Sequence, residues 1–179
     1  KNMAMSDAPI SIGQVALTVL DLDKTAAFYE DVIGLNLIER TGEAARLGIN
    51  TETLIELRQD RSAKPFPKQA GLFHTAFLLP TQRDLGAWLI YATERGVQLD
   101  GTSHHGVSEA LYLSDPEGNG IEIYRDLPRE TWNRQGDAVQ MTTRSLDLRS
   151  LTQNASQWRG APQGTVIGHV HLRVGDVSE

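Results

Sequence analysis

The chain has 179 residues, 40% of them hydrophobic and 22% charged, a balance typical of a globular domain with a real core. Its 17 Lys and Arg residues against 23 Asp and Glu residues give a net charge of −6, which argues against binding to nucleic acid or to an anionic membrane surface. The lack of cysteine excludes disulfides, thiolate metal sites and a cysteine nucleophile, and no apolar run approaches the roughly 18 residues of a membrane span, so we expect a cytoplasmic protein.

A first β-α-β-β-β unit is predicted over residues 10–59, after a polar, disordered-like start over residues 1–9. Polar and apolar residues alternate over 14–20, as in a strand with one buried face. Asp21 and Asp23 can then cap a helix that stops at Gly34. Three further strand candidates complete the unit, at 35–39, 44–47 and 53–58.

A second unit with the same order of elements is predicted over residues 71–126. An alternating strand over 73–79 opens it, and Thr81 caps a helix that ends at Gly96. Asp115-Pro116-Glu117-Gly118-Asn119 is a strong turn sequence before the last strand. The remaining strand candidates lie at 97–100, 109–113 and 120–124.

The opening strand returns a third time near the C-terminus, because residues 167–176 repeat the pattern of residues 12–21. We therefore interpret residues 165–179 as the first strand of a second, truncated domain, joined by a polar connector over 127–164 with a short helix within 146–158. A lone strand is not stable by itself. We expect it to dock on a sheet edge, either of its own domain or of a second copy, which would give a homodimer.

Together the two units predict an α+β domain over residues 10–126, in which paired modules form a curved mixed sheet with the helices on its outer face. Four polar side chains at matching strand positions would line the resulting cup: Gln14, Glu56, His74 and Glu122. Imidazole and oxygen donors suit zinc, iron, nickel or manganese. The alternative is that these are ordinary solvent-facing strand residues, with His74 a hydrogen-bonded core histidine. Their equivalent positions favour the metal site.

Histidines outside this set are further candidates for metal ligands. His169 falls at the repeat position of the polar residue in the two earlier strands, and His171, two residues on, points to the same face. The repeat favours His169 as a ligand, although with its unit truncated we expect it to have no partners in this chain. His104 and His105 lie in a loop, where histidines are mostly solvated, and a ligand or proton donor is the alternative.

Two motifs resemble the vicinal oxygen chelate superfamily, which includes glyoxalase I, extradiol dioxygenases and bleomycin-resistance proteins. They are Asp21-Leu22-Asp23-Lys24 with Phe28-Tyr29-Glu30-Asp31-Val32-Ile33-Gly34-Leu35, and Asp115-Pro116-Glu117-Gly118-Asn119-Gly120-Ile121-Glu122-Ile123-Tyr124. A narrower similarity is to bacterial catechol 2,3-dioxygenase-like proteins built from four such modules. It rests on the segments 105–113, 139–141 and 167–172.

This resemblance implies Fe(II) held by two histidines and one carboxylate, and cleavage of an aromatic diol beside its hydroxyl groups. His169 would be the first ligand, and the other two would come from a C-terminal domain missing here. The intact protein would be an oxidoreductase, and this chain its inactive N-terminal domain.

Two alternatives remain open. Gln14, Glu56, His74 and Glu122 also resemble the ligand set of some glyoxalase I enzymes, which would imply a zinc- or nickel-dependent lyase. A metal-free module that binds a small ligand, similar to bleomycin-resistance proteins, is the other.

Overall fold

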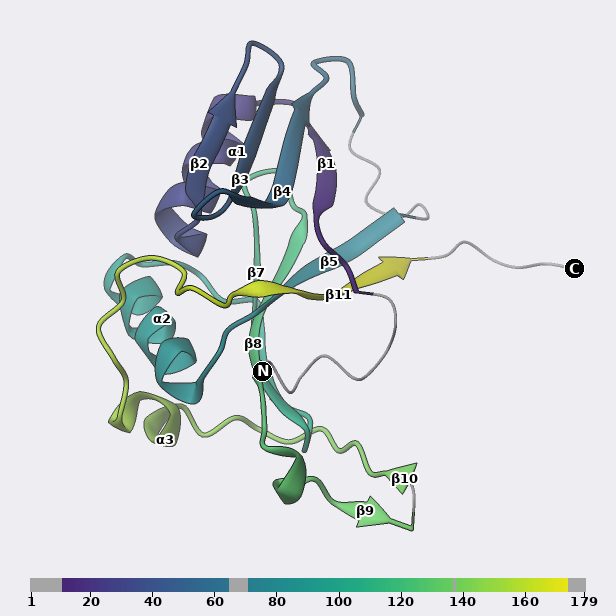
Figure 1. Ribbon diagram of the computed structural model, residues 1–179, viewed down its shortest axis with the longest axis vertical. Helices are drawn as coiled ribbons and strands as arrows, with labels where there is room; N and C mark the ends of the chain where they lie inside the picture. Colours follow the sequence, from purple (N-terminus) through teal and green to yellow (C-terminus); the bar gives the residue numbers. More distant parts are fainter. Residues whose placement is uncertain (1–10, 65–70, 137, 174–179) are drawn as a thin grey trace, which may run out of the picture.

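The computed structural model describes residues 11–64, 71–136 and 138–173, and its elements follow the two predicted units (Figure 1). The first unit forms a sheet of order β1-β4-β3-β2, in which β1 runs parallel to β4. Its elements are β1 (Val15–Val19), α1 (Leu22–Phe28), the π-helical turn η1 (Tyr29–Ile33), β2 (Asn36–Arg40), β3 (Ala44–Ile49) and β4 (Glu52–Gln59). The prediction for residues 1–9 lies outside the described residues.

The second unit and the C-terminal strand share one five-stranded sheet of order β11-β5-β8-β7-β6. Its elements are β5 (Gly71–Leu78), α2 (Gln82–Glu94), β6 (Gly101–His104), β7 (Ser108–Ser114), β8 (Gly120–Asp126) and β11 (Val166–Arg173). The α+β class is therefore confirmed. So is the docking of the last strand, because β11 pairs antiparallel with β5.

The strand predicted at 97–100 is wrong. The Val97 N–H donates to the carbonyl of Ala92, so this segment first closes the end of α2. The Asp100 N–H then donates to Tyr112, and the ladder with β7 begins at Gly101. The pairing with β7, rather than the local sequence, decides where this strand starts.

The predicted helix signals act as capping groups in the structure. The Asp21 side chain accepts from the Lys24 N–H at the start of α1, and Thr81 accepts from the Asp84 N–H at the start of α2. Gly34 ends η1 with a φ of 80°, a left-handed conformation that favours glycine. Both helices therefore begin where the sequence indicates.

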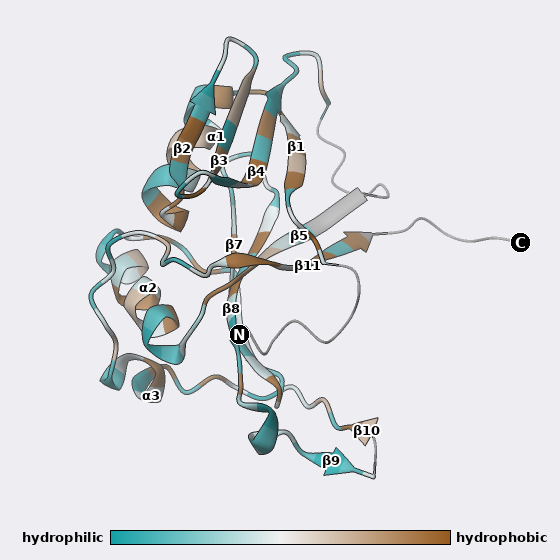
Figure 2. Cartoon of the chain, viewed as in Figure 1, coloured by the Kyte–Doolittle hydropathy of each residue, from teal (hydrophilic) through white to brown (hydrophobic). Residues whose placement is uncertain are grey.

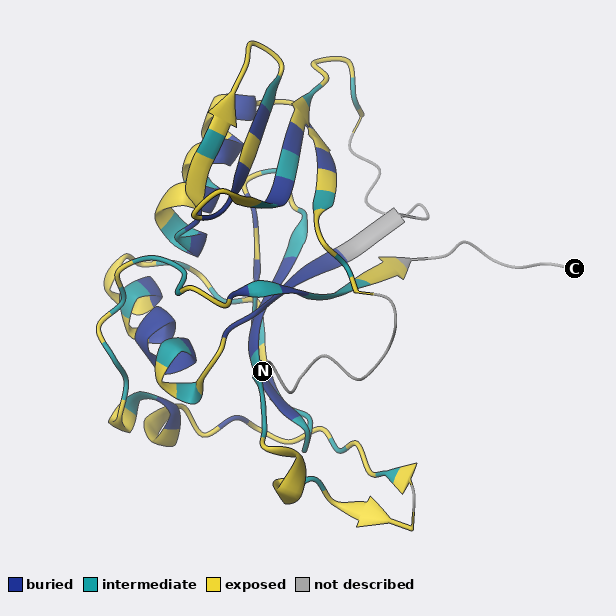
Figure 3. Ribbon diagram, viewed as in Figure 1, coloured by how far each residue is buried: buried dark blue, intermediate teal, exposed yellow. Residues whose placement is uncertain are grey.

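The core forms where the apolar strand faces meet the helices. Figure 2 shows the alternation of apolar and polar residues along the strands of the first sheet, and Figure 3 shows the buried side of α2. Ile55, Phe77 and Trp88 are fully buried in one cluster that spans both units. The indole N–H of Trp88 also donates to the Val32 carbonyl at 2.8 Å, so α2 is tied to the end of η1.

The predicted turn at 115–119 is confirmed, and it joins the two units. The buried Asp115 carboxylate accepts from the Tyr29 hydroxyl at 3.1 Å and from the N–H groups of Glu117 and Asn119, both at 2.9 Å. The Glu117 carboxylate in turn accepts from the Leu20 N–H, just before α1. The two family-like motifs are thus bonded to each other.

The connector contributes four short elements: the 3-10 helix η2 (Arg129–Thr131), β9 (Arg134–Gln135), β10 (Ala138–Val139) and α3 (Leu148–Gln153). The helix α3 confirms the one predicted within 146–158 and packs on α2, where a side chain on Gly86 would overlap the Leu151 carbonyl. Across the described ranges, every helix is too short or too polar to cross a membrane.

Candidate metal centre

Two histidines and one glutamate converge on the sheet face that points away from α2. His74 lies on β5 and Glu122 on β8, its parallel neighbour, while His169 lies on β11 along the other edge of β5. The Nε2 atoms of His74 and His169 both lie 2.9 Å from the same Oε2 atom of Glu122. Two imidazoles and a carboxylate therefore meet at one point.

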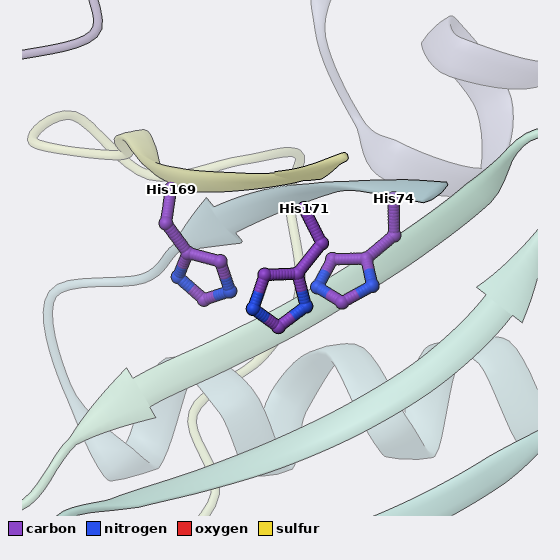
Figure 4. Close-up of side chains that lie close together, drawn as sticks. All are labelled: His74, His169 and His171. Atoms are coloured by element: carbon purple, nitrogen blue, oxygen red, sulfur yellow. The ribbon is translucent and has the colours of Figure 1, made fainter. Parts of the chain in front are cut away.

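A third imidazole adjoins this point. His171 follows His169 on β11 and pairs with His74 across the ladder. Its ring lies 4.3 Å from that of His74, and one nitrogen from each of the three histidines falls within 4.8 Å of the others. Figure 4 shows the rings side by side, two from β11 and one from β5. The prediction that His169 and His171 share a face is confirmed, and the group could bind a metal.

The expectation that His169 has no partners in this chain is wrong. β11 pairs with the free edge of β5, and this brings its side chain to Glu122, which lies 47 residues earlier in the sequence. A strand at the edge of a sheet leaves its backbone N–H and C=O groups open to pairing, and β11 forms hydrogen bonds with those of β5.

Glu122 carries the negative charge of the centre. It is 3% exposed, and burial alone would raise the pKa of its carboxyl group. Hydrogen bonds from His169 and His74 outweigh burial and lower this pKa to about 2. Burial and the neighbouring charges of His74 and His169 lower the pKa of His171. The site thus combines a fixed anion with imidazole donors.

Tyr112 and His105 extend the centre on the Glu122 side. Tyr112 pairs with Glu122 across β7 and β8, and its hydroxyl donates to Oε1 of Glu122 at 3.4 Å. The same hydroxyl lies 3.1 Å from Nε2 of His105. Burial and the Glu122 charge raise the pKa of Tyr112 to about 12. The prediction that His104 lies in a loop is wrong, because it ends β6, where it pairs with Glu109 of β7; its Nδ1 accepts from the Gly106 N–H. Sequence reasoning missed Tyr112, although it sits on a strand facing the predicted Glu122.

Gln14 and Glu56 belong to the first unit, whose sheet is separate from the one that carries His74. Among the described strands, no backbone pairing joins the two sheets. Gln14 is exposed just before β1. Glu56, on β4, accepts from Nε of Arg58 at 2.7 Å, and this bond lowers its pKa. The structure therefore brings His74, Glu122 and His169 together, while Glu56 has an arginine as its partner.

We expect the metal-free protein to lose stability as the pH falls from about 4.5 to about 2. The Glu122 carboxyl titrates near 4.5 in the unfolded chain and near 2 in the folded one, so between these values only the unfolded chain gains the proton. Glu122→Gln should remove this part of the decline in the free energy of unfolding, measured with urea at several pH values. The exposed Glu130→Gln should retain it; equal declines in wild type and Glu122→Gln would refute the assignment.

Comparison with known proteins places this chain in a family. The model of the Glyoxalase/Bleomycin resistance protein/Dioxygenase superfamily matches residues 11–123. A catechol-2,3-dioxygenase of Bacillus subtilis is 42% identical over 175 residues, which cover 94% of this chain and 61% of the relative. A probable lactoylglutathione lyase of Synechocystis is 30% identical over 124 residues, covering 60% of this chain and 88% of the relative. The chain thus spans less than two thirds of the dioxygenase's length.

Solved structures agree on the fold. A glyoxylase/bleomycin resistance protein/dioxygenase domain from Frankia superposes with a TM-score of 0.57 at 19% identity, covering 67% of this chain and all of that domain (100%). A lactoylglutathione lyase from Agrobacterium tumefaciens gives a TM-score of 0.53 at 23% identity, over 65% of this chain and 94% of the lyase. The chain belongs to the Glyoxalase/Bleomycin resistance protein/Dioxygenase superfamily.

Proposed function

We propose that this chain is part of a metal-dependent dioxygenase that opens the ring of a catechol-like diol, with the metal held by His74, His169 and Glu122. One observation carries the proposal: two imidazole nitrogens lie at 2.9 Å from a single carboxylate oxygen. Two histidines and one carboxylate are the donor set of non-haem Fe(II) oxygenases, and they leave positions open for substrate and O₂. The residues present therefore fit Fe(II).

Similarity supports the same reaction class. The Bacillus subtilis relative is a catechol-2,3-dioxygenase, and its match covers 94% of this chain. The family resemblance placed two ligands in sequence beyond this chain, but the three donors proposed here all lie between residues 74 and 169.

Each group around the centre then has a task. A bound Fe(II) ion would supply Lewis acidity toward the diol and electrons toward O₂. Glu122 would offset the positive charge of this ion, and His74 and His169 would bind it through their Nε2 lone pairs. Tyr112 keeps its proton at neutral pH, because its pKa is about 12, and can donate a hydrogen bond. His105, hydrogen-bonded to that hydroxyl, gives a path by which a diol proton leaves the site.

The test loads the chain with Fe(II) without air and then adds catechol and oxygenated buffer. We expect one iron per chain, O₂ uptake, and a ring-opened product that retains both atoms of O₂, identified by mass with ¹⁸O₂. His169→Ala should abolish the product. A chain that binds iron at this site yet leaves catechol intact would overturn the proposal.

A metal-dependent lyase is the second candidate, favoured by the similarity to the Synechocystis protein. It would use Zn²⁺ or Ni²⁺ held by Gln14, Glu56, His74 and Glu122, the set that the sequence predicts. The two candidates share His74 and Glu122 but differ in the remaining ligands. Substitution of those remaining ligands therefore distinguishes them.

A further inference from the structure

The imidazole of His169 is held from two sides. Its Nε2 atom lies 2.9 Å from Glu122, and its Nδ1 atom lies 3.3 Å from the hydroxyl of Tyr124. Tyr124 follows Glu122 by two residues on β8, so both side chains reach the same sheet face. It is 6% exposed, and its ring lies 5.0 Å from that of His169. The Tyr124 hydroxyl is thus a buried partner of the candidate ligand.

Gly168 provides the space for this hydroxyl. A Cβ atom on Gly168 would overlap the hydroxyl and ring of Tyr124. The backbone at Gly168 does not have a positive φ, so the constraint is the contact with Tyr124 and not the glycine's own conformation.

The same glycine lies in a β-bulge that turns β11 toward the site. Ile167 pairs with Phe77, but His169 pairs with the adjacent residue Ala76. Between these two pairs β11 advances by two residues and β5 by one, so β11 has one extra residue. Regular alternation would put Ile167 and His169 on one face. Instead Ile167 is fully buried in the main core, while His169 faces Glu122. The bulge therefore re-aims the histidine.

We propose that Tyr124 is a positioning residue, which holds His169 with its Nε2 atom toward the metal. The missing side chain of Gly168 leaves the space that Tyr124 occupies. This inference rests on the proposed metal site. A neutral imidazole that offers Nε2 to a metal carries its proton on Nδ1, where it donates to the Tyr124 oxygen. In the metal-free protein the hydroxyl can donate instead.

The experiment titrates the metal-free chain with Co²⁺ and records both the dissociation constant and the visible absorption spectrum. We expect Tyr124→Phe and Gly168→Ala each to weaken binding by about 10- to 100-fold, the usual effect of losing a group that orients a ligand, and to alter the spectrum. The matched controls are Tyr91→Phe, whose hydroxyl donates to the Asp31 carbonyl, and Gly101→Ala, where a Cβ meets nothing within 4 Å. Both should bind Co²⁺ like the wild type.

The outcomes separate this inference from the metal site itself. If the wild type binds Co²⁺ and Tyr124→Phe binds it equally with the same spectrum, Tyr124 does not position the ligand. The same conclusion follows if Tyr124→Phe lowers only the stability of the metal-free protein, measured with urea. If the wild type does not bind Co²⁺, the proposed metal site fails, and this inference with it. Tyr124→Phe removes a single oxygen atom, so the test does not depend on whether Gly168→Ala folds.

Discussion

His169→Ala is expected to weaken metal binding by well over 100-fold, more than the about 10- to 100-fold typical of a residue that only orients a ligand. The substitution removes one of the two imidazoles that face Glu122 and leaves the buried carboxylate with His74 alone. The measurement is the dissociation constant for Fe(II) without air, with Co²⁺ as an air-stable substitute.

Gln14→Ala and Glu56→Ala are the matched comparisons, since they remove the ligands that only the lyase-like site requires. We expect both to bind within about twofold of the wild type, because Gln14 is exposed and Glu56 is paired with Arg58. The reverse pattern, with His169→Ala unaffected and Zn²⁺ or Ni²⁺ lost on Glu56→Ala, would exclude our site and favour the lyase. Glu122→Ala should abolish binding under both candidates and does not distinguish them.

Asp115→Ala is expected to lower the free energy of unfolding by about 3 kcal/mol, a large effect for one residue. Asp115 is 5% exposed, and its loss leaves the Tyr29 hydroxyl and the N–H groups of Glu117 and Asn119 without their acceptor. The same loss loosens the turn whose Glu117 binds the start of α1. Urea unfolding measures the change.

Two further variants show whether the loss comes from this network. Asp23→Ala removes an exposed ion pair with Arg40 and should change stability by less than about 1 kcal/mol. Tyr29→Phe combined with Asp115→Ala forms a double-mutant cycle, in which the two losses should not add. An Asp115→Ala variant as stable as Asp23→Ala would contradict the proposed link between the units.

Local signals accounted for most elements. The caps Asp21 and Thr81 each accept from an N–H group three residues later. The strands show an alternation of apolar and polar residues, which is visible in neighbouring residues of the sequence. Both can therefore be predicted from neighbouring residues. The start of β6 could not, because it depends on a ladder with β7. Strand boundaries of this kind follow from pairing between distant segments.

The candidate site likewise combines residues that the sequence identified with residues that only the structure revealed. The repeat identified His74, Glu122 and His169 because equivalent strand positions place side chains on equivalent faces. It did not indicate which sheet edge the C-terminal strand would pair with, since any open edge can form hydrogen bonds with the backbone of an added strand. Tyr112 and Tyr124 were missed for the same reason: their partners lie on other strands of the sheet and are distant in sequence.

The sequence by itself thus determined the α+β class, the repeated unit, the helix caps and the polar residues that could bind a metal, because these depend on short-range patterns. Only the tertiary structure decided that β11 pairs with β5, that a bulge at Gly168 turns His169 away from the core, and that Glu122 lies between two imidazoles. These depend on which distant strands exchange hydrogen bonds, and that choice is set by the free energy of the whole fold.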